Sequence, residues 1–338
     1  MKLLQFIDPQ DGQHLGLVEG DRVIDLGPGG LHEVYYEEGG DEVGLVTAVE
    51  SLRDRAGDAR RLDLSQLLAS RDASSLHLTK PVSGPSDNPH ALKVWLAGVT
   101  HEVSAKLREI EAQQATGATV NVYDQKYREV SSGGRPELFS KGEPDAVRGH
   151  GQAVTRPADT VRLVPETELV SVYAMNREGQ LERLGYTGGN DVTDNGIEAD
   201  NPLNLPQAKN WSGGCASLGP LLVTADEYDD GDVTVSCEIL RDGQRIGFKE
   251  GKTGRDNLNM PDNLLHLERH LFRRIQLEAR SLLAFYWGTP IVFSEADLSD
   301  GVQVGDVMRL AFSGGIGQLE NAVVALEETG QLAGLEAN

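Results

Sequence analysis

The stretch Val164-Pro165-Glu166-Thr167-Glu168-Leu169-Val170 places two carboxylates inside an apolar run. On a β-strand, residues two apart project to the same side, so we expect Glu166 and Glu168 to point in parallel. Their apolar neighbours make unpaired carboxylates costly, and two adjacent anions favour a bound cation. A solvated strand face is the commoner outcome for alternating glutamates, so the pattern alone leaves both alternatives open.

A third acidic candidate follows in Gly185-Tyr186-Thr187-Gly188-Gly189-Asn190-Asp191-Val192-Thr193, where apolar neighbours flank Asp191. Three carboxylates with open positions form a hard oxygen site, which suits Mg²⁺, Mn²⁺ or Ca²⁺ rather than zinc. Glu166, Glu168 and Asp191 are therefore candidate metal ligands.

The first part of the chain reads as short extended runs over 2–26, followed by helical patterns over 45–53 and 62–68. The segment 81–89 carries three prolines among Ser, Gly and Asp, which is typical of a linker. We therefore divide the chain into a small N-terminal domain (1–88), a catalytic domain (89–330) and a tail (331–338).

Beyond the linker, apolar runs predict several short strands, a charged helix over 102–114 and one long helix from 263 to about 285. Asp242-Gly243 is a strong hairpin signal between strands over 233–240 and 245–248. Short strands with few helices indicate an α+β fold built on a mixed sheet or β-roll. The other expected strands are 94–98, 163–165, 169–174 and 221–224.

Composition excludes several classes of protein. The 338 residues carry 53 acidic and 31 basic side chains, and the net charge of −22 repels nucleic acids and anionic membranes. No apolar run approaches the roughly 20 residues of a membrane span, and no signal-like start is seen, so we expect a cytoplasmic protein. Glycine-rich phosphate-binding motifs are missing, which removes support for dinucleotide and P-loop readings.

The basic residues are unusual, because only nine of the 31 are lysines. Acidic, lysine-poor surfaces suit a high-salt cytoplasm, where screening weakens the self-repulsion of the chain. We therefore hypothesise a halophilic source, with an ordinary acidic protein as the alternative.

Two cysteines, Cys215 and Cys237, are too few for a disulfide framework.

A succession of short motifs runs along the second part of the chain. They are Pro165-Glu166-Thr167-Glu168-Leu169, the 185–193 stretch quoted above, Gln207-Ala208-Lys209, Leu218-Gly219-Pro220, Val223-Thr224-Ala225-Asp226-Glu227, Gly288-Thr289-Pro290, Gly305-Asp306-Val307 and the segment 315–321. These motifs resemble those of the fumarylacetoacetate hydrolase superfamily, in the family's order and over about 94–325. The resemblance implies a β-roll catalytic domain, a smaller N-terminal α+β domain and a homodimer or higher homo-oligomer.

Two segments, 200–209 and Arg135-Pro136-Glu137-Leu138-Phe139-Ser140-Lys141, look closest to a sugar-acid branch resembling 2-keto-3-deoxy-pentonate dehydratases. This likeness implies a divalent cation, Mg²⁺ before Mn²⁺ or Ca²⁺, held by the three carboxylates named above. The carboxylate and 2-keto oxygens of the substrate would chelate it. The expected reaction converts 2-keto-3-deoxy-D-xylonate or L-arabinonate to 2-oxoglutarate semialdehyde in oxidative pentose degradation.

Some positions depart from the family pattern. Asn195-Gly196 stands where many members carry Arg-Asp, and Glu198 where a Gln is expected, so contacts to the distal end of the substrate are in doubt. A His-x-x-Glu pair that hydrolytic relatives use to activate water is replaced by Ser104 and Leu107. This favours an elimination over hydrolysis.

For catalysis the sequence offers Lys209 as the proton-transfer group and Glu168 as a catalytic metal ligand, with a purely ion-pairing Lys209 as the alternative. The residues expected to bind substrate are Lys141, Lys209, Thr289, Asn195 and Glu198. A structural salt bridge is the slightly preferred alternative for Lys141, and a turn residue without a binding role is the alternative for Thr289. Two other functions stay open, namely hydrolytic C–C cleavage of an acylpyruvate or diketo acid and non-catalytic binding of a metal or sugar acid.

Overall fold

The computed structural model describes residues 1–338 apart from 58, 104, 107–109, 111–121 and 328–338. Its largest sheet has 12 strands, ordered β4-β3-β2-β1-β14-β12-β11-β17-β6-β7, with β5 on β1 and β8 on β14. These strands are β1 (Lys2–Asp8), β2 (Gly12–Glu19), β3 (Arg22–Pro28), β4 (Arg61–Asp63), β5 (His77–Leu78), β6 (Leu92–Gly98), β7 (Glu137–Ser140), β8 (Val147–Arg148), β11 (Thr167–Met175), β12 (Leu181–Asp191), β14 (Ala216–Thr224) and β17 (Leu282–Tyr286).

A second sheet of five strands has the order β16-β15-β18-β19-β9. The expected hairpin joins β15 to β16, and both turn residues, Asp242 (φ 50°) and Gly243 (φ 74°), have the positive φ that such a turn requires. The strands are β9 (Val154–Arg156), β15 (Val233–Arg241), β16 (Gln244–Thr253), β18 (Val307–Phe312) and β19 (Gly317–Ala325), with β10 (Leu163–Val164) and β13 (Thr193–Asp194) forming a separate pair.

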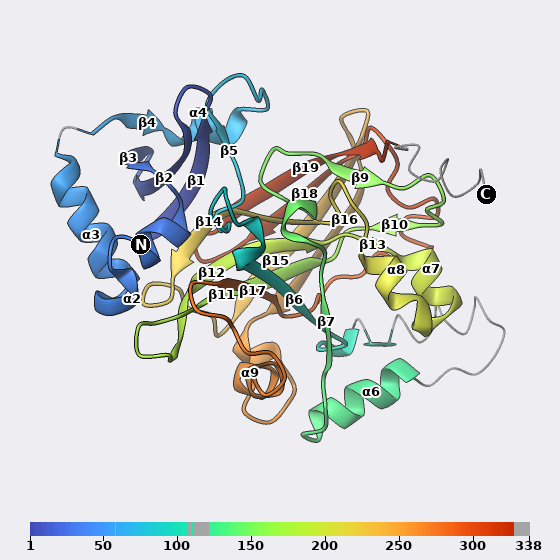
Figure 1. Cartoon of the computed structure of the whole chain (residues 1–338). Coiled ribbons are helices and arrows are strands. Elements are labelled where there is room, and N and C mark those ends of the chain that lie inside the picture. The colour runs from blue at the N-terminus through green and yellow to red at the C-terminus, as the bar shows by residue number, and fades with distance from the viewer. Residues whose placement is uncertain (58, 104, 107–109, 111–121, 328–338) are drawn as a thin grey trace, which may run out of the picture.

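Helices lie around the sheets, with α2 and α3 at one end and α7 and α8 at the other (Figure 1). Among the described residues, no helix is long and apolar enough to cross a bilayer. The helices are α1 (Leu31–Tyr36), α2 (Gly40–Val43), α3 (Leu45–Ala56), α4 (Leu64–Ala69), α6 (Val122–Ser131), α7 (Asn195–Asp200), α8 (Leu205–Lys209) and α9 (Leu264–Phe272).

Strand β11 lies at the centre of the core and is buried on both faces. Leu169 packs into one hydrophobic cluster together with Ile239 of the second sheet. Its neighbour Val170 points the other way, into a cluster that contains Val49 of α3. A strand covered on both sides needs apolar residues at every position, which explains why 169–174 reads as a continuous apolar run. The expected α+β fold on mixed sheets is confirmed.

The N-terminal strands are continuous with the main sheet. Strand β1 pairs antiparallel with β14, where Lys2 lies opposite Val223 and Leu3 opposite Leu222. Strand β14 pairs in turn with β12, which ends at Asp191, so hydrogen bonds through β14 join the first strands to the strands that carry the acidic motifs. The domain boundary near residue 88 stays a prediction.

The prediction of one long helix over 263–285 is wrong. The helix α9 ends at Phe272, and the segment Leu282–Tyr286 is strand β17, hydrogen-bonded to β11 and β6. All five residues of β17 are buried, and a short unbroken apolar run fits a two-faced strand as well as a buried helix. Most of the expected helix over 102–114 lies outside the described residues, and so does the whole tail over 331–338.

Candidate active site

The structure brings Glu166, Glu168 and Asp191 together where one strand begins and the next ends. Thr167 opens β11 opposite Asn190 near the end of β12, and Glu168 pairs with Gly189. Because the two strands are antiparallel, the start of β11 meets the end of β12. One carboxylate oxygen from each of the three acidic residues lies within 4.8 Å of the others.

Backbone contacts fix these carboxylates in place. Asn190 Oδ1 accepts a hydrogen bond from the Glu166 N–H (3.1 Å), and the Asp191 N–H donates to the Glu166 carbonyl (3.0 Å). The Gly288 N–H, just beyond β17, donates to Glu168 Oε2 at 2.7 Å. Glu168 and Asp191 are 0% exposed, so the site is held away from bulk solvent.

Two buried lysines contact the triad. Lys209, the last residue of α8, donates from Nζ to Asp191 Oδ2 (2.6 Å) and Thr193 Oγ1 (2.7 Å), and lies 3.1 Å from Glu166 Oε2. Lys141, just after β7, has its Nζ 2.7 Å from Asp191 Oδ1. It also donates to the carbonyls of Val192 (2.8 Å) and Lys209. Asp191 is therefore held between two ammonium groups.

Asp191 and Glu168 have pKa values shifted in opposite directions. Burial alone would raise the pKa of Asp191, but Lys141 and Lys209 hold the pKa below its ordinary value. Burial raises the pKa of Glu168 well above its ordinary value, and the negative charges of Asp191 and Glu166 add to this effect. Without another positive charge, the site therefore penalises ionisation of Glu168.

A small cavity of about 30 Å³ adjoins the triad. This is far below the roughly 300–1,000 Å³ of a typical small-molecule site, so a five-carbon acid can enter only if lining side chains move. Val99, at one wall, has φ 54°, an unusual backbone conformation for a β-branched residue and one that often marks functional sites. The polar side chains that line the cavity are Tyr123, Glu137, Glu166, Glu168, Glu198, Lys209 and Thr289.

The sequence analysis did not single out Glu137, which lines this cavity from the start of β7. Burial, with a further contribution from the charge of Glu198, raises the pKa of Glu137 to about 7. A carboxyl group with such a pKa can both take and release a proton near neutral pH. Its only sequence signal was its place inside the quoted segment 135–141.

The remaining predicted residues are placed as follows. Glu198 lines the cavity. Thr289 also lines it, but its Oγ1 donates to the Ile291 carbonyl (2.7 Å) and accepts from the Ile291 N–H (3.1 Å) within its own turn. Asn195 is not among the residues that line the cavity, and its Oδ1 accepts a hydrogen bond from Arg162 Nη2. Their roles in substrate binding stay predictions, and Ser104 and Leu107 lie outside the described residues.

The donor set fits a hard divalent cation. All three candidate ligands are carboxylates, the chemistry that Mg²⁺, Mn²⁺ and Ca²⁺ prefer. Glu168 Oε1 is buried and has no hydrogen-bond partner among the described residues, which leaves a lone pair to be satisfied by a ligand. The neutral or charged state of Glu168 would then depend on that ligand.

The chain is similar in sequence to several known proteins. A family model described as "Fumarylacetoacetate (FAA) hydrolase C-terminal" matches residues 110–324. A curated Haloferax volcanii protein named "Probable 2-keto-3-deoxyxylonate dehydratase" is 32% identical over 74% of this chain and 76% of its own length. A Saccharolobus solfataricus protein named "2-dehydro-3-deoxy-D-arabinonate dehydratase" is 35% identical over 56% of this chain, which spans only 57% of that relative.

Solved structures show the same fold. An apo 2-keto-3-deoxy-D-arabinonate dehydratase has a TM-score of 0.70 and 25% identity, and the alignment covers 97% of this chain and 100% of that one. A structure described as 2-keto-3-deoxy-D-arabinonate dehydratase complexed with magnesium and 2,5-dioxopentanoate has a TM-score of 0.69 and 24% identity over the same shares of the two chains. The likeness extends over the N-terminal strands as well as the triad region.

Proposed function

The chain belongs to the fumarylacetoacetate hydrolase family, and from that premise we propose that it is a hydro-lyase that dehydrates a 2-keto-3-deoxy-pentonate. The buried triad of Glu166, Glu168 and Asp191 beside a cavity lined by Glu137 is the observation that carries this proposal. Both curated relatives bear the names of dehydratases of this substrate class. The candidate substrates are 2-keto-3-deoxy-D-xylonate and its L-arabinonate counterpart, as a step of oxidative pentose degradation.

Glu166, Glu168 and Asp191 would hold the divalent cation, with Mg²⁺ placed before Mn²⁺ or Ca²⁺. When bound, such a cation supplies positive charge that stabilises the negative charge developing on the 2-keto oxygen as the C3 proton leaves. The solved relative with magnesium and 2,5-dioxopentanoate supports this choice, since 2,5-dioxopentanoate is the semialdehyde product expected here.

Glu137 is the proton-transfer group that the geometry favours. The C3 proton of the substrate lies α to a carbonyl, and Glu137 in its carboxylate form would take it. The C4–O bond then breaks, and the same carboxyl group can return the proton to the departing hydroxyl, which leaves as water. The unsaturated 2-keto acid tautomerises to 2-oxoglutarate semialdehyde.

Lys209 has a role other than proton transfer in this scheme, because three acceptors surround its ammonium group. We propose that Lys209 positions Asp191 and Glu166 and binds the substrate carboxylate, and we keep it as the alternative base. Lys141 holds Asp191 from the other side. We propose that Glu198, which lines the cavity, contacts a distal hydroxyl of the substrate, with Thr289 and Asn195 as further candidates.

The experiment uses purified protein with Mg²⁺ and each 2-keto-3-deoxy-pentonate, with formation of the semialdehyde followed through a coupled aldehyde dehydrogenase. The proposal expects turnover that EDTA abolishes and Mg²⁺ restores. Release of pyruvate from an acylpyruvate, without dehydration, would instead establish the hydrolase alternative. Absence of both reactions in a protein that still binds Mg²⁺ would leave the non-catalytic binding function.

We also propose a cellular setting for this enzyme. The strongly acidic composition and the curated metabolic relatives support a cytoplasmic enzyme of pentose catabolism. A homodimer or larger homo-oligomer remains the expected assembly, and light scattering coupled to size-exclusion chromatography would measure it.

A further inference from the structure

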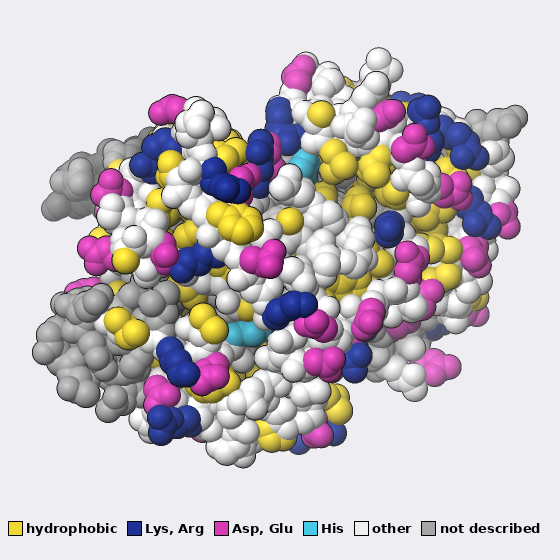
Figure 2. Space-filling view, turned by 180° about the vertical axis from the view of Figure 1, so that it is seen from behind, with side chains coloured by type: hydrophobic (Ala, Val, Ile, Leu, Met, Phe, Trp, Pro, Cys, Tyr) yellow, Lys and Arg dark blue, Asp and Glu magenta, His cyan; other side chains and the backbone are white. Residues whose placement is uncertain are grey.

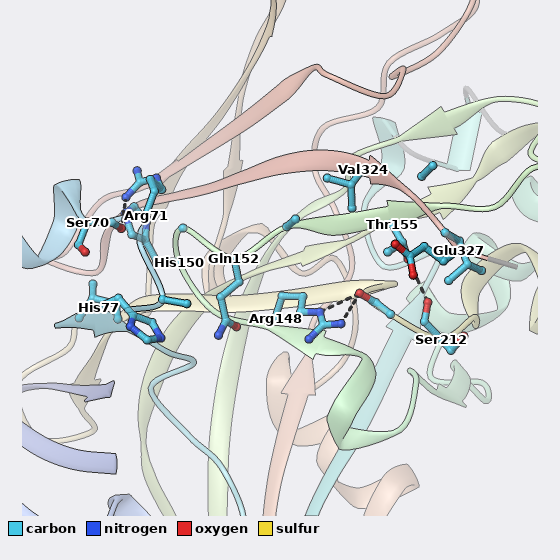
Figure 3. Close-up of a pocket in the computed structure, with 17 residues that line it drawn as sticks. Ser70, Arg71, His77, Arg148, His150, Gln152, Thr155, Ser212, Val324 and Glu327 are labelled. Carbon is cyan, nitrogen blue, oxygen red and sulfur yellow. Dashed lines mark hydrogen bonds between the residues drawn. The ribbon is translucent and has the colours of Figure 1, made fainter. Parts of the chain in front are cut away.

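A second cavity, of about 660 Å³, lies between the N-terminal strands and the second sheet (Figure 3). Its walls come from the segment 70–73 just after α4, strand β5, the segment 148–155, residues 212 and 213, and the end of β19 with the two residues that follow it. It shares no lining residue with the cavity beside Glu168. The proposed dehydration gives this larger cavity no role.

The walls carry more positive than negative groups, although the chain as a whole has a net charge of −22. The positive groups of the lining are Arg71 and Arg148, and Glu327 is the one carboxylate among the lining residues. His77 and His150 also line the cavity, and burial lowers the pKa of His150. Arg71 is already compensated, because its Nη2 lies 2.6 Å from Glu320 Oε1. The ring nitrogens of His150 contact the Leu68 carbonyl and the Glu320 N–H.

Arg148, at the end of β8, is held by a backbone carbonyl rather than by a carboxylate as Arg71 is. Its Nε (2.8 Å) and Nη2 (2.5 Å) both donate to the carbonyl of Gly213, which fixes the plane of the guanidinium. Among the residues that the structure describes, no carboxylate pairs with Arg148 and its Nη1 has no hydrogen bond. The charge of Arg148 also contributes, after burial, to lowering the pKa of Lys80 to about 8. An uncompensated positive charge thus faces the cavity.

Gln152 offers a second oriented donor beside Arg148 (Figure 3). Its Oε1 accepts a hydrogen bond from the Gly149 N–H at 2.6 Å, so the amide is held in one orientation. Within the described part of the chain, the Gln152 NH₂ group has no hydrogen-bond partner. Apolar side chains, including Leu78 and Val324, cover other parts of the wall.

We propose that this cavity binds a small organic anion through a carboxylate or phosphate group held by Arg148 Nη1 and the Gln152 amide. A planar guanidinium presents paired donors that match either group. The cavity has the size of a small-molecule site, which exceeds what an isolated inorganic anion fills, and its apolar wall suits the carbon skeleton of the ligand.

Isothermal titration calorimetry of the metal-free full chain tests this with three probes that share a carbon skeleton: glucose 6-phosphate, D-gluconate and neutral D-glucose. At least one of the two anions should bind, and D-glucose should not. Arg148→Gln should weaken binding about tenfold or more, the effect expected when a charge-assisted hydrogen bond is lost. The stronger of the two anions identifies phosphate or carboxylate as the preferred group.

Two further variants keep the test decisive. Val324→Trp, at a position 41% exposed at the cavity wall, should block binding by filling space without removing any charge. Glu168→Gln should bind the anion as the wild type does, because it alters only the site beside the triad. Three results would each overturn the proposal, whatever the outcome of the dehydratase assay. The first is loss of anion binding in Glu168→Gln together with its retention in Arg148→Gln. The others are binding of D-glucose equal to that of the anions, and no binding of either anion.

Discussion

Lys141 Nζ lies 2.7 Å from Asp191 Oδ1, and both side chains are 0% exposed. Lys141 follows β7 and Asp191 ends β12, so this ion pair joins strands that are not neighbours in the main sheet. A buried carboxylate is stable only when it has a well-placed partner. Lys141 therefore keeps Asp191 charged and oriented before any ligand arrives.

The first prediction concerns this pair. Lys141→Met should lower the free energy of unfolding by about 3–5 kcal/mol, because it leaves a buried carboxylate with one counter-charge fewer. Urea denaturation measures the change. Lys252→Met is the matched control, since Lys252 forms a pair with Asp232 in which both side chains are more than half exposed, and it should change stability little. Equal effects of the two substitutions would contradict a structural role for Lys141.

The second prediction concerns Glu137 and activity. Glu137→Gln should lower kcat about 10²–10⁴-fold, the range for loss of a general acid–base group, with a smaller effect on KM. The wild-type pH profile should show an ionisation near 7 that the variant lacks. Glu143→Gln, at an exposed position, serves as the control. If the Glu137→Gln enzyme kept a near wild-type kcat, Glu137 would not be the proton-transfer group, and Lys209 would be the remaining candidate.

The third prediction concerns Glu137 and stability. Because burial raises the pKa of Glu137 from 4.5 to about 7, the folded protein holds a proton that the unfolded chain releases. Its contribution to stability is therefore full below about 4.5 and falls as the pH rises toward 7. Glu137→Gln should flatten this part of the profile in urea titrations of the metal-free protein. A variant profile with the wild-type slope would show that the pKa of Glu137 is not raised in the folded protein.

The fourth prediction concerns Gly288, whose N–H donates to Glu168. Gly288 has φ +87°, and a Cβ there would lie 2.1 Å from Thr100 Oγ1 and 2.8 Å from the Ala97 carbonyl. Gly288→Ala should therefore destabilise the fold by about 3 kcal/mol or more and weaken Mn²⁺ binding. Gly243→Ala has the same kind of backbone strain (φ +74°) but open space around it, so it should leave Mn²⁺ affinity unchanged. Equal Mn²⁺ affinities in both variants would argue against Gly288 as a support for Glu168.

The fifth prediction concerns salt. The face in Figure 2 shows acidic and basic side chains interspersed, while the net charge of the chain is −22. At molar salt the screening length falls to about 3 Å, which removes most repulsion between surface carboxylates. The Tm should therefore rise by several degrees between dilute buffer and molar KCl. If the Tm did not rise with salt, the halophilic hypothesis would be wrong.

The features that sequence reasoning found are local ones. Glu166 and Glu168 could be paired because strand periodicity is fixed by the backbone. Asp191 was grouped with them through its apolar neighbours and the family resemblance, and the pairing of β11 with β12 brings it close to them. The contacts of Asp191 with Lys141 and Lys209 depend on packing between distant segments, which periodicity does not encode.

The errors have equally physical causes. Leu282–Tyr286 was expected to continue a helix because a short apolar run is compatible with either structure until its neighbours are known. Glu137 was overlooked because its raised pKa comes from burial and from Glu198, which is brought near it only by the fold.

The central claim is that Glu166, Glu168 and Asp191 together bind one divalent cation that holds a 2-keto acid. Anomalous diffraction from a crystal soaked in MnCl₂ and pyruvate tests it most directly. We expect one strong manganese peak at roughly 2 Å from a carboxylate oxygen of each residue, the distance range of hard-cation ligands, with pyruvate on the same ion. Absence of a peak between these three carboxylates, while manganese occupies another site, would contradict the claim.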